Sequence, residues 1–397
     1  MTHHDRPALA RQYADALQGK TPFSGAGDGL FVAGERRTGK SQFLRFDLMP
    51  ELKRRGVLPL YADLLHDKAK APEDALAEVL AQAVREHLGG VAKFFTEAGI
   101  EKISVPGMLS IDLKAIGKTG GMSLYQVLDL LQKQVKKPIA LVVDEAQHAL
   151  TSESGDAAMW SLKSARDQMK TATGAKLMLV MSGSHSDKLS MLLNSKTAPF
   201  WGSVVQQLPK LGDDFADAQL AELRTAYPTL SALRGSVARN AFDHVGRRPP
   251  FFEIAIKEAL AASGAPAHCD AATFEKALLE ITQQSAQRDR AGYTAVYLAL
   301  EPLEQAVLVR LIEQGTAFRP FDAPSMAFYA QQLGAKVGTK VGTKVGPSAV
   351  QKALDALREH SEQLVWKSQR GQYAVYDQGL LAWHAFLVAD MAWPPKG

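Results

Sequence analysis

The chain has 397 residues, of which 46% are hydrophobic and 22% are charged, so we expect an ordinary globular protein of two or three domains. Its single cysteine excludes an internal disulfide and a cysteine-rich metal site, and the net charge of +4 permits nucleic-acid binding without arguing for it. No apolar run approaches the roughly 20 residues of a membrane helix, and the polar N-terminus lacks a secretion signal, so we expect a cytoplasmic protein without a membrane segment.

The first elements along the chain surround a phosphate-binding pattern. Residues 7–17 predict an amphipathic helix, which either covers the next strand or lies against the base of a nucleotide. After a buried strand, the pattern G-x-x-x-x-G-K-[ST] is formed by Gly34, Glu35, Arg36, Arg37, Thr38, Gly39, Lys40 and Ser41. We expect its backbone amides to bind phosphate, Lys40 to reach the terminal phosphates and Ser41 to ligate Mg²⁺. The alternative is a glycine-rich turn without a ligand.

An acidic pair follows the third predicted strand. The elements before it are a helix, a strand, a second helix, an inserted hairpin and a third helix, at 40–55, 57–64, 73–88, 102–113 and 123–136. Residues 138–143 form an apolar run that ends in Asp144 and Glu145, at the edge where parallel sheets bind ligands. Asp144 is suited to hold Mg²⁺ with Ser41, and Glu145 to polarise the attacking water. Alternatively, the pair is a solvated strand end or a helix cap.

Two further strands complete a doubly wound parallel sheet. The strand at 176–185 ends in polar residues, of which Ser184, in preference to Ser182, is our candidate to sense the γ-phosphate. The alternative is that these residues cap the helix that begins near Asp187. The fifth strand is predicted at 203–211.

From residue 213 the pattern is purely helical, with helices predicted at 215–227, 230–245, 250–262 and 271–287. Arg247 and Arg248 precede the third of these helices. Positive charge at a helix N-terminus opposes the helix dipole, so we expect either arginine to reach the nucleotide phosphates. The alternative is an exposed pair.

The C-terminal part has the layout of a winged helix: three helices at 303–314, 325–333 and 348–360, then strands at 363–367 and 372–376. Residues 296–397 carry ten Lys or Arg against nine Asp or Glu, so this part is not basic overall. Positive charge gathers on the third helix, the hairpin turn and the repeat Lys-Val-Gly-Thr that spans 336–347. The repeat is either an arm that contacts phosphate or extra length, without a function, in a loop that tolerates insertions.

These motifs resemble the AAA+ and STAND-type P-loop ATPases, above all archaeal-type ATPases with a C-terminal winged helix, relatives of the origin-recognition initiators. The resemblance covers nearly the whole chain and includes Asp144-Glu145-Ala146-Gln147, Ser182-Gly183-Ser184 and the segments 198–202, 246–249 and 373–377. It implies ATP and Mg²⁺ as cofactors, with Lys40 and Ser41 on phosphate and metal. It further implies Asp144 as the magnesium-associated acid, Glu145 as the base, Ser184 as the first sensor, and Arg247 or Arg248 as the second.

Together, the residues and the resemblance predict an α/β fold: a doubly wound parallel-sheet P-loop core at 1–212, an all-α lid at 213–295 and a winged helix-turn-helix domain at 296–397. Family members often have an arginine shortly after a Pro-aromatic-Gly stretch, but here Trp201-Gly202 is followed by Ser203, and the nearest upstream cation is Lys196. Slow hydrolysis used as a switch is therefore favoured over activation by a neighbouring subunit.

We expect an ATP-hydrolysing switch that couples its nucleotide state to the binding of double-stranded DNA by residues 296–397. The alternative is a signalling ATPase whose winged helix docks a protein partner or inhibits the core. A small-molecule kinase suits the helical lid and winged helix less well. An effector enzyme as partner and an oligomer that forms with nucleotide stay open.

Overall fold

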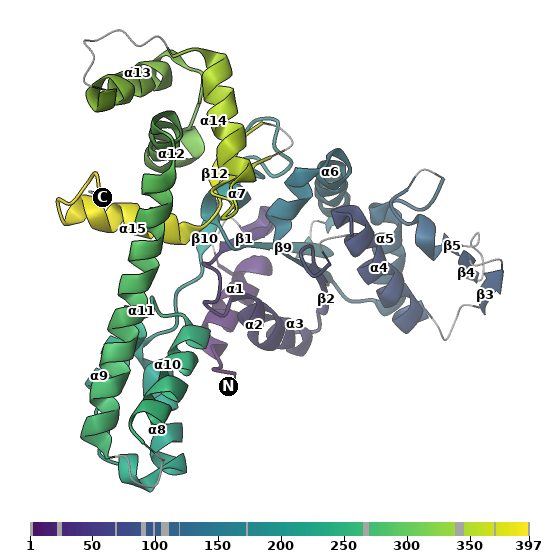
Figure 1. Ribbon diagram of the computed structural model, residues 1–397. Coiled ribbons are helices and arrows are strands. Elements are labelled where there is room, and N and C mark those ends of the chain that lie inside the picture. Colours follow the sequence, from purple (N-terminus) through teal and green to yellow (C-terminus); the bar gives the residue numbers. More distant parts are fainter. Residues whose placement is uncertain are drawn as a thin grey trace.

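The computed structural model describes residues 3–21, 26–67, 70–88, 93–97, 100–104, 111–118, 120–171, 174–264, 270–337, 345–368 and 371–395 (Figure 1). At their centre is a five-stranded sheet in the order β10-β1-β9-β6-β2, in which every neighbouring pair is parallel. Its strands are β1 (Leu30–Ala33), β2 (Leu58–Asp63), β6 (Ile139–Asp144), β9 (Leu177–Gly183) and β10 (Val205–Gln207). Each lies where a strand was predicted, although β10 is only three residues long within the predicted range 203–211.

Helices cover both faces of this sheet, because side chains alternate between the faces along each strand. Leu30 and Val142 pack with the helices on one face, and Phe31 and Val143 pack with those on the other. The first face is covered by α1 (Pro7–Leu17), α2 (Lys40–Gln42), the π-helical stretch η2 (Phe43–Leu48) and α3 (Met49–Arg54). The second is covered by α4 (Pro72–Leu88), α5 (Leu124–Val135) and α6 (Glu153–Gln168).

The strand order places the sequence motifs side by side. Because β9 lies between β1 and β6, the loop after β1 and the acidic pair after β6 flank the serines at the end of β9. All three segments follow the carboxyl ends of parallel strands, where such sheets bind ligands. Short elements complete this part: η1 (Ala26–Asp28), η4 (Ala146–Thr151), β7 (Lys170–Thr171), β8 (Gly174–Ala175) and α7 (Ser186–Ser190).

The predicted hairpin insertion belongs to a small separate sheet. Strand β4 (Ile100–Ser104) pairs with β5 (Ile111–Asp112), as predicted, although the turn between them lies outside the described residues. A further strand, β3 (Lys93–Glu97), pairs antiparallel with β4 and was not predicted. The turn η3 (Leu113–Ala115) leads from this sheet back to α5. The sheet lies at the end of the α/β core remote from the helical parts (Figure 1).

The lid is built from the helices that follow β10. They are α8 (Asp213–Ala226), the turn η5 (Pro228–Leu230), α9 (Gly235–His244), α10 (Pro249–Ala262) and α11 (Ala271–Ala299). Helix α11 continues twelve residues beyond its predicted end at Gln287. Its first part packs in the lid around Phe274, whereas its last part packs with the C-terminal helices around Tyr297, so packing at both ends extends it (Figure 1).

The C-terminal part has the predicted three helices and hairpin, followed by one unpredicted helix. The elements are α12 (Pro302–Gln314), η6 (Gly315–Ala317), α13 (Ala323–Val337), α14 (Pro347–Glu359), β11 (Val365–Lys367), β12 (Tyr373–Val375) and α15 (Gln378–Ala389). Strands β11 and β12 pair antiparallel to form the wing. Most of the tetrapeptide repeat, at 338–344, lies outside the described residues. No helix in the described ranges is long and apolar enough to span a membrane.

The wing is shared between two hydrophobic clusters. Val365 and Val375 pack in the core of the C-terminal part, whereas Trp366 and Ala374 pack with the α/β core. Trp366 is 8% exposed and Ala374 only 1% exposed. The wing therefore lies against the α/β core rather than projecting into solvent.

Candidate nucleotide-binding site

The loop between β1 and α2 is shaped to bind an anion. Arg37 and Gly39 adopt left-handed backbone conformations, with φ of 67° and 88°. A Cβ at Gly34 would lie 3.3 Å from Leu208 Cβ, so close packing favours glycine there. Within the described part of the chain, the backbone N–H groups of Arg36, Arg37 and Gly39 donate no hydrogen bond. Turned, unpaired amides before a helix are the usual arrangement for holding phosphate.

Lys40 and Ser41 meet the acidic pair of the neighbouring strand, as the sequence predicts. Lys40 is 5% exposed and forms an ion pair with Asp144, and its Nζ lies 3.2 Å from Glu145 Oε1. Ser41 Oγ donates a hydrogen bond to Asp144 Oδ2 at 2.5 Å. A hydroxyl and a carboxylate at this separation offer the oxygen ligands that Mg²⁺ prefers.

Asp144 is the hub of the site and is 1% exposed. Its Oδ1 also accepts a hydrogen bond from Ser182, and its Oδ2 accepts one from Tyr61 at 2.8 Å. Burial alone would raise the pKa of Asp144, but Lys40 and the hydroxyl donors lower it to about 2. The sequence analysis preferred Ser184 to Ser182 and missed Tyr61, because a tyrosine inside an apolar strand carries no motif.

Glu145 is fixed by three neighbours and a left-handed backbone, with φ of 54°. Its Oε2 accepts hydrogen bonds from Gln147 Nε2 at 2.5 Å and from Ser184 Oγ at 2.9 Å. Burial would raise the pKa of Glu145, yet the Lys40 charge and these donors lower it below its ordinary value. The buried Gln147 was part of the motif Asp-Glu-Ala-Gln but had been given no role.

A cavity of about 540 Å³ opens beside the loop, between the α/β core, the lid and the C-terminal part. The loop contributes Glu35, Arg36 and Arg37 to its wall, and Ser184 lies at its floor. Lys210 and Arg248 add positive charge from the connection to the lid and from the lid itself. The wall also carries carboxylates, and Lys210 pairs with Glu35 at 2.9 Å, so a polyanion in this cavity would compete with acidic side chains for these cations.

The two candidate lid arginines have different surroundings. Arg248 lines the cavity, where it donates to Val245 O at 3.0 Å and pairs with Asp289 at 3.2 Å. Arg247 is absent from the cavity wall and instead joins Asp243 at 2.6 Å and Asp213 at 2.8 Å. Of the two, only Arg248 lines the cavity beside the loop.

On its other side the loop faces a small hollow closed by the N-terminus. Thr38, Gly39, Phe215 and Pro249 line it, together with His4 and Arg6. Residues 7–17 were expected either to cover the next strand or to lie against a base. Helix α1 covers β1, and the residues before the helix, not the helix itself, line this hollow. The pocket is flanked by the α/β core and the lid.

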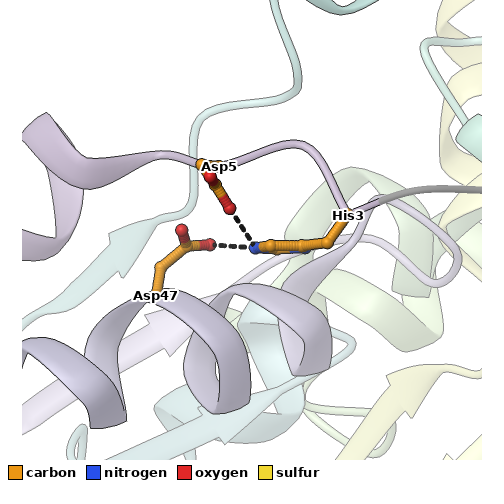
Figure 2. A group of neighbouring side chains, drawn as sticks. All are labelled: His3, Asp5 and Asp47. Atoms are coloured by element: carbon orange, nitrogen blue, oxygen red, sulfur yellow. Dashed lines mark hydrogen bonds and ion pairs between the residues drawn. The ribbon is translucent and has the colours of Figure 1, made fainter.

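The N-terminal segment is anchored to both sides of this hollow. His3 Nε2 lies 2.9 Å from Asp47 Oδ2 on η2 and 3.6 Å from Asp5 (Figure 2). Asp47 Oδ1 accepts from the Arg6 amide at 2.8 Å, so both oxygens of this buried carboxylate are used. His4 pairs with Asp214 of the lid at 3.0 Å. Anchoring accounts for the His3–Asp5–Asp47 group without a metal.

The residues fit a nucleotide triphosphate and Mg²⁺ by their chemistry. Unpaired amides and Lys40 suit phosphate oxygens, and the Ser41 hydroxyl with the Asp144 carboxylate suits a hard cation. Lys40 keeps its charge, since burial, which would lower its pKa, is outweighed by Asp144 and Glu145.

Comparison with known proteins supports the fold. No family model and no curated protein matches the chain. The ADP form of the Aeropyrum pernix ORC2 protein matches with a TM-score of 0.51 and 16% identity, over 97% of this chain and 93% of that one. The ADPNP–ADP complexes of ORC2 give 0.47 at 15% identity, over 97% and 94%. The ORC1 protein of that organism in complex with DNA gives 0.35 at 17%, over 97% and 92%.

The likeness to the ADP form of ORC2 confirms the predicted fold class: an α/β core around a doubly wound parallel sheet, followed by helical parts. The domain boundaries at 212/213 and 295/296 stay predictions.

Proposed function

We propose that this protein binds and hydrolyses ATP with Mg²⁺ and uses its nucleotide state to control the winged helix. One observation carries the enzymatic part: Ser41 Oγ lies 2.5 Å from Asp144 Oδ2 while Lys40 bridges Asp144 and Glu145. Two segments far apart in the sequence thus bring a candidate phosphate ligand, a candidate metal ligand pair and a candidate base together. The ORC2 protein, whose fold this chain shares, was solved in its ADP form.

Each residue has a distinct role in this proposal. The loop amides and Lys40 bind the phosphates, and Ser41 and Asp144 hold Mg²⁺, which neutralises phosphate charge. Glu145 is anionic at neutral pH and orients the attacking water, with Ser184 holding its carboxylate. Arg248 contacts the terminal phosphate from the lid.

Two substitutions test the enzyme. Lys40→Ala should abolish ATP binding or nearly so, because a buried cation facing the phosphates is lost. Glu145→Gln should bind ATP normally and lose hydrolysis, since the amide keeps the shape but not the charge. Binding is measured by titration with a fluorescent ATP analogue and hydrolysis by phosphate release. Normal turnover by Glu145→Gln would remove the base assignment.

A contact between the wing and the phosphate loop supports the control of the winged helix. The Tyr376 ring lies between the Lys188 ammonium, 4.0 Å from its centroid, and the Arg36 guanidinium, at 5.2 Å. Lys188 also donates to Tyr376 O at 3.0 Å. We call these contacts of Tyr376 with Arg36 and Lys188 the Tyr376 clamp. Arg36 also lines the cavity, so phosphate that draws its guanidinium away weakens the Tyr376 clamp.

We propose double-stranded DNA as the target of the winged helix. Helix α14 is amphipathic: Val350, Leu354 and Leu357 are buried, whereas Lys352 and Arg358 are exposed. These cations suit phosphate contacts along a groove.

The test is DNA binding with an ATP analogue, with ADP and without nucleotide. Affinity should depend on nucleotide and fall steeply between about 50 and 200 mM salt. Absence of binding at low salt with the ATP analogue would remove the DNA assignment.

The buried wing favours a second candidate, a winged helix that docks on proteins, beginning with its own core. Trp366 and Ala374 are covered by the α/β core, so the wing is closed to DNA in this conformation. In that case the chain should capture a protein partner stably, show no DNA affinity, and hydrolyse ATP faster when the wing is displaced.

A further inference from the structure

Tyr61 lies in the middle of strand β2, away from every sequence motif. It pairs in register with Val142 of β6, two residues before the acidic pair. Its hydroxyl nevertheless reaches Asp144 Oδ2 at 2.8 Å. Asp144 thus has a donor from a strand that otherwise only completes the edge of the sheet.

We infer that Tyr61 is a positioning residue for the metal-associated carboxylate, which it holds so that Asp144 Oδ2 stays beside the Ser41 hydroxyl. This inference rests on the proposed function, because it concerns the same metal site. Groups that orient ligating carboxylates tune metal affinity although they never contact the metal.

The two oxygens of Asp144 have different partners. Oδ1 accepts from Lys40, Ser182 and the Glu145 backbone N–H, and Oδ2 accepts from Ser41 and Tyr61. When Lys40 transfers its hydrogen bonds to phosphate, Oδ1 loses its charged partner but keeps its two neutral donors. On Oδ2, where Ser41 would ligate the metal, Tyr61 is then the donor that holds this oxygen in place.

Tyr61 is itself held in place. The Arg45 guanidinium lies 5.5 Å from the centroid of its ring, and the ring packs against the cluster around Phe43. Burial and the Asp144 charge raise the pKa of Tyr61, so the phenol remains a donor throughout the physiological range. The packing depends on the ring and the positioning depends on the hydroxyl, so the two roles can be separated by substitution.

The test is Tyr61→Phe, which removes the hydroxyl and keeps the ring. A fluorescent ATP analogue is titrated into the full chain at a series of Mg²⁺ concentrations and in EDTA. Affinity in EDTA should match wild type, whereas the Mg²⁺ concentration that gives half of the metal-dependent tightening should rise at least about tenfold. Tyr125→Phe in α5, a conservative change remote from the loop, is the control and should behave as wild type.

The outcomes separate this inference from the proposed function. If wild type tightens with Mg²⁺ and Tyr61→Phe needs the same or less Mg²⁺, the positioning role is refuted and the ATPase site stands. A merely structural role would lower the thermal unfolding temperature and leave the Mg²⁺ requirement unchanged, which also refutes it. If wild type binds no ATP, the proposed function fails and this inference fails with it.

Discussion

Lys188 has its charged end buried without a carboxylate partner among the described residues. It lies on α7, is 4% exposed, and donates to Tyr376 O. Burial, followed by the nearby positive charge of Arg36, lowers the pKa of Lys188 from 10.5 to about 7. The contact between wing and core therefore contains a group that changes charge near physiological pH.

This pKa predicts how stability depends on pH. Between pH 7 and 10.5 the unfolded chain binds more protons at Lys188 than the folded chain, so the free energy of unfolding rises with pH there. Relative to Lys188→Met, wild type should gain up to roughly 1.4 kcal/mol per pH unit above pH 7. Urea unfolding at several pH values measures the difference.

Lys276→Met serves as the control, because its side chain is 77% exposed. This variant should parallel wild type at every pH. A wild-type-to-Lys188→Met difference that stays constant from pH 7 to 9 would show that Lys188 keeps an ordinary pKa.

For single residues, sequence motifs identify the charged side chains of the site but miss the uncharged side chains that hydrogen-bond to them. Lys40, Ser41, Asp144 and Glu145 could be predicted because their chemistry requires fixed spacings from a loop and a strand end. Tyr61 and Ser182 act through contacts that only the register of β2, β6 and β9 creates. Gln147 contacts Glu145 locally, from two residues further along the chain. The sequence analysis chose Ser184 over Ser182, but both serines contact the acidic pair: Ser184 donates to Glu145, and Ser182 donates to Asp144.

Among the elements, the start of α10 carries the two arginines that we propose as candidates to contact the nucleotide. Arg247, with φ of 55°, ties α9 to the start of α8 through Asp243 and Asp213. Arg248 lines the cavity and stacks on Phe251, with its Cζ 4.4 Å from the ring centroid. Adjacent residues thus differ: Arg247 joins helices of the lid, and Arg248 lines the cavity.

Replacing Arg247 and replacing Arg248 by alanine should have different effects. Arg248→Ala should reduce the preference for ATP over ADP about tenfold, as expected for losing a charged hydrogen bond to phosphate. Arg247→Ala should keep that preference and lower stability by about 0.2–1 kcal/mol, because its ion pairs are partly exposed. Nucleotide titrations and thermal unfolding measure the two effects; a shared loss of ATP preference would contradict the division.

Element ends and unpatterned helices are where sequence-based prediction is weakest. Helix α11 was predicted to end at Gln287, because the polar stretch after it contains Gly292 and loses the apolar period. Packing against the C-terminal helices extends α11 beyond this point. Helix α15 was missed because it is apolar on most faces and shows no helical period, and β3 because it pairs only within the insertion.

For the whole molecule, the Tyr376 clamp predicts how nucleotide and winged helix communicate. Tyr376→Ala removes the ring that Arg36 and Lys188 share, each contact contributing about 0.5–2 kcal/mol. DNA affinity should then become independent of nucleotide. Tyr376→Phe is the matched control, because it keeps the ring and should keep the dependence. Nucleotide-dependent binding by Tyr376→Ala would mean that communication takes another route.

The length of helix α11 sets how far a movement of the lid would displace the C-terminal part. It is one unbroken rod of 29 residues, about 43 Å at 1.5 Å per residue, with its ends embedded in different bodies. Were the lid to tilt by about 10° on closing over phosphate, the far end would sweep roughly 7 Å, by the geometry of such a rod. That stroke spans about two base-pair steps of a duplex, at 3.4 Å each. A small rotation of the lid would thus become a larger movement at the far end of α11, enough to change which base pairs the C-terminal part would contact.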